Sequence, residues 1–247
     1  MEWTASPSGT VWRKRVHLVG PAESGQVTSV VRYEPSSTFH GHNHPDGEEI
    51  LVLDGVFSDE HGDWPAGTYL LNPEGFRHAP FSRDGCVLFV KLRQFPGRAR
   101  DHVVLRTAEL PWETLRAGVA VRRLYAQAGF ADTMRLERWE PGAALGRIDY
   151  ASGAELFVLD GSFRDAGGAF ARGAWVRLPP GASHAPSSPA LLPRIRRQHH
   201  AAPPPPRRIP PCRRPPRRRP RAPRPFPWKM RRRERSPPNS ARLTTPE

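Results

Sequence analysis

The chain has 247 residues and only two cysteines, Cys86 and Cys212, which lie far apart, so we expect neither a disulfide framework nor a cysteine-based zinc site. The sequence contains no run of about 18 apolar residues, the length needed to span a membrane. The polar first residues also lack the apolar stretch of a signal peptide, so we expect a cytoplasmic protein with no membrane partner. The net charge of +14 is uneven: residues 191–247 carry 18 Lys and Arg against 2 Asp and Glu, whereas residues 1–190 carry 20 against 22. The body is slightly acidic, and its charge does not indicate a nucleic-acid-binding protein.

Short apolar segments between turn residues predict an all-β fold for the body. In chain order, the first half is expected to form strands at 26–35, within 48–59, within 63–75 and at 85–95. The segment 48–59 is expected to contain a turn at Asp54-Gly55 between two strands. Many short strands with regular turns are typical of a β-sandwich or barrel.

The body is also a tandem repeat. Shifted by 106 residues, "GEEILVLDGVFSDEHGDWPAGTYLLNPEGFRHAPFS" (47–82) aligns without a gap on "GAELFVLDGSFRDAGGAFARGAWVRLPPGASHAPSS" (153–188). A connection between the two copies is expected to hold one helical turn around Trp112 to Arg116. The expected segments are a first domain at 1–100, a linker at 101–117, a second domain at 118–190 and a tail at 191–247.

The stretch "FHGHNHPDGEE" (39–49) contains several candidate metal ligands. Alternate side chains of a strand share a face, so His42 and His44 point the same way, and the short turn at 45–47 returns Glu48 to that face. His78 follows Glu48 by 30 residues, just after the corner "NPEGFR". Three imidazoles and one carboxylate can bind Zn²⁺, Fe²⁺, Mn²⁺ or Ni²⁺ and leave a coordination position for water or substrate.

The alternative to a metal site is an ordinary polar turn, since an H-x-H pair alone is common in exposed turns. The presence of Glu48 and of a third histidine, His78, at these spacings favours the metal site. Glu49 has the opposite parity, so we expect it to face outward and pair with a basic residue. His40 and His61 are expected at the surface. Cys86 opens the apolar run "CVLFV" and is expected to be a small core residue rather than a redox thiol.

The patterns H-x-H-x₃-E and P-x-G-x₂-H resemble the two motifs of the cupin superfamily, and 44–82 is most similar to the cupin domain of ChrR-type anti-sigma factors. The resemblance covers 10–95 well and 118–190 more loosely. It implies two tandem cupin barrels, jelly-roll-like in architecture, and one divalent metal ion, usually zinc, held by His42, His44, Glu48 and His78. Anti-sigma activity is not implied, because in that group it belongs to a separate N-terminal helical domain, whereas this chain starts directly with the cupin.

The second domain lacks most of these ligands. Ile148, Tyr150 and Ala154 stand opposite the first two histidines and the glutamate, and only His184 remains, opposite His78. One histidine cannot hold a catalytic metal ion. We therefore expect a degenerate, incomplete second barrel that serves as a packing partner. His184 is expected to be a hydrogen-bonded polar group, the alternative being a residue of a ligand pocket.

Residues 191–247 contain 16 of the 30 prolines and most of the excess arginine, a composition that predicts disorder. The repeat requires a closing strand near 191–198, where the sequence instead changes abruptly. We hypothesise that the tail is a frameshifted reading of a GC-rich gene; translating the encoding DNA in the other two frames would refute this if neither continues with a strand like "CVLFVKL". The alternative is a genuine basic arm that binds nucleic acid, although Phe226 and Trp228 are its only aromatic residues.

Two classes of function follow from the sequence. One is a metal-dependent module that binds or senses a small molecule or an oxidant; the other is a dioxygenase-type enzyme in which iron or manganese binds a small organic substrate. No acid–base residue is assigned, although Tyr69, Asn72 and Lys91 lie on neighbouring strands. A homodimer is the expected assembly.

Overall fold

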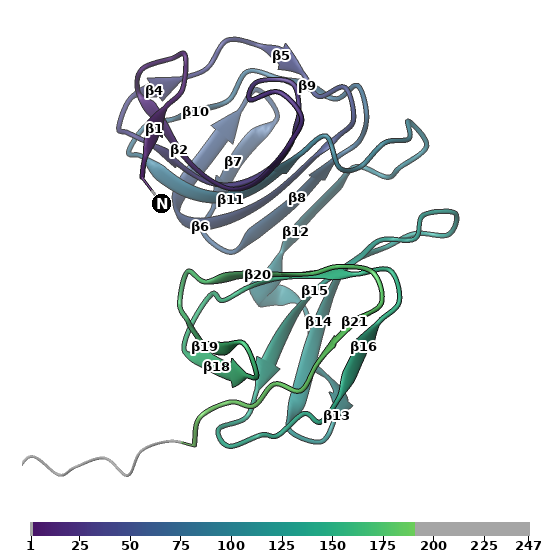
Figure 1. Ribbon diagram of the computed structural model, residues 1–247. Helices are drawn as coiled ribbons and strands as arrows, with labels where there is room; N and C mark the ends of the chain where they lie inside the picture. Colours follow the sequence, from purple (N-terminus) through teal and green to yellow (C-terminus); the bar gives the residue numbers. More distant parts are fainter. Residues whose placement is uncertain (1, 191–247) are drawn as a thin grey trace, which may run out of the picture. The chain divides into compact units, whose positions relative to one another are not determined.

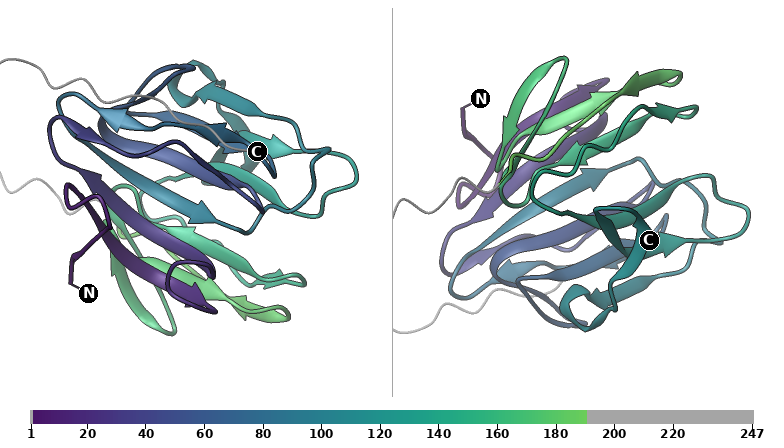
Figure 2. Two further views of the ribbon diagram at one scale, coloured as in Figure 1. Left: turned by 90° about the horizontal axis from the view of Figure 1, so that it is seen from above. Right: turned by 90° about the horizontal axis from the view of Figure 1, so that it is seen from below.

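The computed structural model describes residues 2–190, and almost all regular structure there is β-strand. Figures 1 and 2 show strands joined by short loops in both halves of this range. The all-β class and the two-unit arrangement expected from the sequence are confirmed. The tail at 191–247, expected to be disordered, lies outside the described residues.

The first unit is built on a sheet that runs in the order β1-β2-β3-β11-β6, with β8 on the other edge of β6 and β12 beyond β8. Its strands, all but β3 labelled in Figure 1, are β1 (Thr4–Ala5), β2 (Val11–Val19), β3 (Gln26–Tyr33), β4 (Ser37–Thr38), β5 (His42–Asn43), β6 (Glu48–Asp59), β7 (Gly62–Pro65), β8 (Thr68–Asn72), β9 (Arg77–His78), β10 (Phe81–Ser82), β11 (Cys86–Leu92) and β12 (Val103–Arg106).

The period-two pattern of the sequence determines which side chains enter the first barrel. In β11, Cys86, Leu88 and Val90 are buried and alternate with partly exposed neighbours. They pack with Ile50 and Phe57 in one buried apolar cluster. The ligand-bearing strands lie next to this core, which holds them in place.

The turn expected at Asp54-Gly55 is wrong. β6 runs without reversal from Glu48 to Asp59; its first part pairs with β8 and β11, and its second part pairs with β7 and β10. Gly55 has φ of 71°, and a β-carbon there would lie 2.2 Å from the carbonyl oxygen of Gly85. The glycine therefore allows a bend between the two parts rather than a hairpin, and the register with β11 shifts nearby.

The second unit repeats the first. Its strands are β13 (Glu113–Arg116), β14 (Val119–Ala126), β15 (Thr133–Trp139), β16 (Ile148–Tyr150), β17 (Ala154–Phe157), β18 (Ser162–Asp165), β19 (Gly168–Ala171), β20 (Trp175–Leu178) and β21 (Ala182–His184). At the shift of 106 residues, β15, β17, β20 and β21 correspond to β3, the start of β6, β8 and β9.

The segment expected to be a linker contributes a strand to each unit: β12 pairs with β8, and β13 pairs with β14. The helical turn expected at Trp112 to Arg116 is wrong, because Glu113–Arg116 is a strand and a short 3-10 helix lies earlier, at Thr107–Glu109. The Trp112 ring lies 4.5 Å and 4.6 Å from the guanidinium carbons of Arg122 and Arg138. These cation–π contacts hold the segment against the sheet in extended form.

The two units pack together, as expected for a packing partner. Phe89 of β11 stacks on Phe157 of β17 with ring centroids 4.5 Å apart. Leu51 and Tyr69 of the first unit share a second apolar cluster with Tyr125 and other side chains of β14 and β15. The second unit thus covers the outer face of the first barrel's sheet around β8, β6 and β11.

Candidate metal centre

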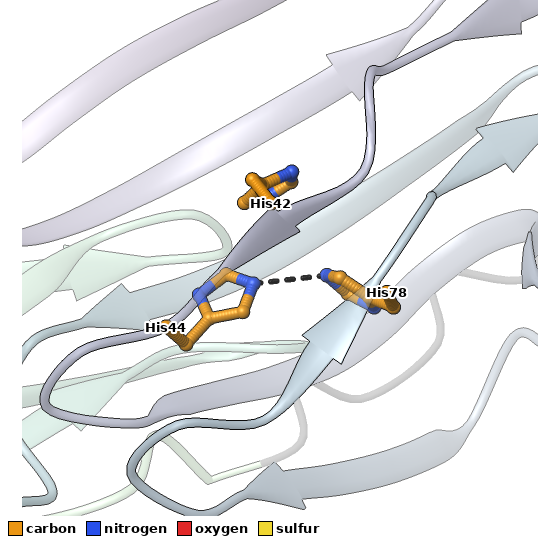
Figure 3. Close-up of side chains that lie close together, drawn as sticks. All are labelled: His42, His44 and His78. Atoms are coloured by element: carbon orange, nitrogen blue, oxygen red, sulfur yellow. Dashed lines mark hydrogen bonds between the residues drawn. The ribbon is translucent and has the colours of Figure 1, made fainter.

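The predicted ligands come from three neighbouring elements of the first barrel. β5 and β9 pair antiparallel with His42 directly opposite His78. His44 follows β5, and Glu48 begins β6, opposite Asn72 of β8. Figure 3 shows the three imidazoles gathered around one point.

The distances among the ligand atoms are short. His44 Nε2 lies 2.9 Å from His78 Nε2, and Glu48 Oε2 lies 3.4 Å from the first and 3.6 Å from the second. One ligand atom of each histidine lies within 4.8 Å of those of the other two. His44, Glu48 and His78 are buried, whereas His42 is half-buried, which makes the His42 side the accessible one.

Hydrogen bonds on the far side of the rings orient two of the histidines. His42 Nδ1 lies 2.8 Å from the carbonyl oxygen of His40, and His78 Nδ1 lies 3.1 Å from Asp59 Oδ2. Carbonyl and carboxylate oxygens only accept, so each Nδ1 carries the proton and each Nε2 keeps its lone pair for a cation. The Asn72 side chain donates to Glu48 Oε2 at 3.0 Å and orients this carboxylate in the same way.

The charges around the cluster favour a cation. Burial lowers the pKa of His44, and the charge of Glu48 opposes this only in part. Burial also acts to lower the pKa of His78, but the hydrogen bond to Asp59 and the charge of Glu48 outweigh it and raise that pKa. Donor atoms of three imidazoles and one carboxylate, partly desolvated and held by outer partners, fit a first-row divalent ion.

Sequence reasoning missed Asp59 and gave Asn72 no role. Asp59 Oδ2 accepts from His78, while Asp59 Oδ1 accepts from the backbone N–H groups of His61 and Gly62 and from Trp64 Nε1. The repeat could have indicated Asp59. In both copies an aspartate lies 19 residues before the histidine that the two copies share, Asp59 before His78 and Asp165 before His184.

Residues expected outside the site lie mostly as predicted. His40 and His61 are exposed. Cys86 is a buried free thiol, and burial raises its pKa to about 11, which fits a core residue. Tyr69 and Lys91 lie on the opposite face of the sheet from the metal cluster, toward the second unit.

The expectation for Glu49 is wrong in part. Its side chain does point away from the ligand cluster, but it is buried against the second unit rather than exposed, and burial raises its pKa. Lys91 is its cross-strand neighbour, yet the Lys91 ammonium group contacts Glu155 at 3.1 Å instead. Strand parity identified the face but could not show that a second barrel covers it.

In the second unit the equivalent place holds a hydrogen-bonded chain of three side chains. His184 Nδ1 lies 3.0 Å from Asp165 Oδ2, and Tyr150 Oη lies 3.1 Å from His184 Nε2. Ile148 pairs with His184 in the register in which His42 pairs with His78. Both ring nitrogens of His184 are thus satisfied, as expected, and the other three ligand positions carry no imidazole or carboxylate.

A comparison with protein families finds the same domain in both copies of the repeat. The model of the ChrR cupin-like domain matches residues 1–96 and again 100–192. The chain belongs to the ChrR cupin-like family. Two tandem cupin domains are therefore confirmed, and no curated protein sequence matches the chain.

Solved structures with the same fold are distant in sequence. A candidate dioxygenase from Nostoc punctiforme PCC 73102 superposes with a TM-score of 0.62 at 15% identity, covering 72% of this chain and 69% of that one. A glyoxylate-induced protein from Pseudomonas aeruginosa, also named as a candidate, gives 0.55 at 13%, covering 75% and 79%. An oxalate decarboxylase variant from B. subtilis gives 0.52 at 15%, covering 76% and 71%. These similarities show the bicupin fold alone.

Within residues 2–190, no helix is long and apolar enough to cross a membrane.

Proposed function

We propose that the first cupin barrel binds one divalent metal ion, zinc in the first place, through His42, His44, Glu48 and His78. The observation that carries the proposal is the buried convergence of His44 Nε2, His78 Nε2 and Glu48 Oε2 within 2.9–3.6 Å of one another. Such a concentration of donor atoms is costly to desolvate without a cation or proton between them. When bound, the ion would supply a Lewis-acidic site for one small ligand.

We further propose that this centre binds or senses a small molecule or an oxidant rather than turning over a substrate. The carboxylates beside the cluster are already engaged: four donors surround Asp59, and Glu60 accepts from the backbone N–H of Ala79 at 2.7 Å. A group that moves protons in catalysis needs to reach the substrate. The half-buried His42, with the Phe39 ring 5.4 Å from it, marks the side from which a ligand would approach.

Elemental analysis of the purified protein, followed by titration of the stripped protein with Zn²⁺, Mn²⁺ and Fe²⁺, tests the proposal. We expect about one equivalent of metal in the unaltered protein and near zero in His78→Ala. His184→Ala is the matched control, because it removes the equivalent histidine of the second barrel and should leave the stoichiometry unchanged.

The outcomes separate the alternatives. Failure of the unaltered, folded protein to bind any of the three ions, or equal loss in both variants, would overturn the metal site. Tight binding of zinc supports the binding module. Preference for iron together with oxygen uptake in the presence of small organic acids would instead support a dioxygenase-type enzyme, the second class expected from the sequence.

A further inference from the structure

The second barrel has an open strand position. In the first barrel, β11 lies between β3 and β6 and pairs antiparallel with both along its seven residues. Their counterparts β15 and β17 each pair on one edge only, with β14 and β20. Within residues 2–190, neither strand has a partner on its other edge. Among these described residues, the edges of β15 and β17 that correspond to the two joined by β11 carry no strand.

Burial shows the effect of this open position. Ile50 of β6 is 1% exposed, whereas its counterpart Leu156 of β17 is only half-buried. Tyr33 of β3 is buried, whereas its counterpart Trp139 of β15 is half-buried. Apolar side chains that β11 covers in the first barrel thus retain exposed surface in the second, which favours binding of another apolar strand.

A buried carboxylate supplies an independent reason to expect a specific strand. Lys91 of β11 crosses to the second barrel and contacts Glu155 at 3.1 Å; Arg177 also approaches Glu155, at 3.9 Å. Glu49 is the counterpart of Glu155 in the repeat, and its side chain is 91% buried but forms no ion pair within residues 2–190. A strand placed like β11 in the second barrel would bring its own basic residue to Glu49, as Lys91 reaches Glu155.

We propose that the free edges of β15 and β17 bind an extended strand supplied in trans by a partner polypeptide. The strand resembles β11: antiparallel to both edges, with aliphatic side chains at alternate positions facing the barrel interior, and with a basic side chain at the sixth of seven positions, directed at Glu49. Backbone hydrogen bonds to two edges provide affinity, and the basic residue provides register.

The chain's own sequence in this register is poorly suited to the position. The repeat places residues 192–198 there, which lie outside the described residues. Arg197 does fall at the place of Lys91, but Pro193 lacks the N–H that a central strand donates, and Arg194 and Arg196 stand at the inward-facing places of Leu88 and Val90. The proline and the two inward-facing arginines favour a strand from a partner over one from this chain.

The probe is a synthetic peptide, GSVLFVKLRQ, which is residues 85–94 with Cys86→Ser, titrated into the full-length protein. We expect saturable binding of one peptide per chain, together with slowed amide hydrogen exchange confined to β15 and β17. The same peptide with Lys91→Glu should bind about tenfold more weakly, a difference of about 1.4 kcal/mol. In the protein variant Glu49→Gln, this difference should shrink.

Three results would overturn the proposal. The first is an absence of saturable binding to the folded protein, including the case in which a second copy of the chain already protects β15 and β17 and excludes the peptide. The second is protection that appears on other strands. The third is equal binding of the lysine and glutamate peptides, which would remove the role of Glu49. None of these depends on the metal centre.

Discussion

Substitution of Asp59 by asparagine should weaken metal binding although Asp59 contacts no metal ion. Asp59 Oδ1 accepts from three donors, the N–H groups of His61 and Gly62 and the indole of Trp64, at 2.8–3.3 Å. In Asp59→Asn the side-chain oxygen has to stay with these donors, which places the amide NH₂ against His78 Nδ1. His78 must then accept at Nδ1 and carry its proton on Nε2, the atom proposed to bind the metal ion.

The size of the loss in metal affinity follows from the other orientation that the asparagine side chain can adopt in the variant. Rotating the amide would restore the tautomer of His78 but break three hydrogen bonds, each worth about 1 kcal/mol net. The penalty for binding the ion is therefore at most about 3 kcal/mol, or roughly a hundredfold in affinity. Loss of an outer hydrogen-bond partner typically costs about 10–100-fold in metal affinity, and we expect a value in this range.

Competition between the protein and a chromophoric chelator for Zn²⁺ measures this change. The matched control is Asp165→Asn, which alters the same aspartate–histidine pair in the second barrel, where the distance is 3.0 Å. Both variants should lower the free energy of unfolding, but only Asp59→Asn should lower zinc affinity. An affinity within twofold of the unaltered protein in folded Asp59→Asn, or an equal loss in the control, would refute the reasoning.

Other predictions concern the core and the bend in β6. Ile50→Ala should cost about 2–5 kcal/mol in the free energy of unfolding, and Leu156→Ala at the equivalent, half-buried position less than half of that; denaturant titration compares them, and equal costs would contradict the difference in burial. In a Cys212→Ser background, Cys86 should react with a thiol reagent only after denaturation, because burial raises its pKa to about 11; labelling of the native protein would show otherwise. Gly55→Ala should destabilise by more than about 1 kcal/mol, since its φ is 71° and the new β-carbon would meet a carbonyl oxygen at 2.2 Å; an unchanged unfolding midpoint would argue against it.

Much of the fold could be predicted from the sequence, because the alternation of apolar residues and the internal repeat support the same strand assignments. Alternation of apolar residues predicted β11, and the shift of 106 residues places its counterpart near 191–198, outside the described residues. The errors arose where backbone geometry depends on distant contacts. Asp54-Gly55 looks like a hairpin turn locally, but β11 pairs across it and keeps β6 continuous.

The candidate ligands were predictable for a similar reason, and their supporting residues were not. Parity placed His42, His44 and Glu48 on one face, and the corner before His78 brought it opposite His42. Asp59 is the last residue of β6, and nothing in local periodicity shows that this end of the strand lies beside His78. Only pairing of the strands in three dimensions makes that contact.

The aspartate–histidine hydrogen bond can serve two roles, stabilising the barrel and orienting a metal ligand, and comparing the two barrels separates them. In the second barrel, Asp165 holds His184 at nearly the same distance as Asp59 holds His78, although the other three ligand positions carry an isoleucine, a tyrosine and an alanine. The pair therefore does not need a metal ion, and in each barrel it ties the strand after the Pro/Gly corner, β9 or β21, to the end of β6 or β18. On this basis the first barrel would bind metal through an imidazole, that of His78, which the fold already orients. The presence or absence of a metal centre would then depend on the other three ligand positions, and substitutions there would leave the barrel itself intact. The same separation explains why the two aspartate variants should share a cost in stability and differ in metal affinity.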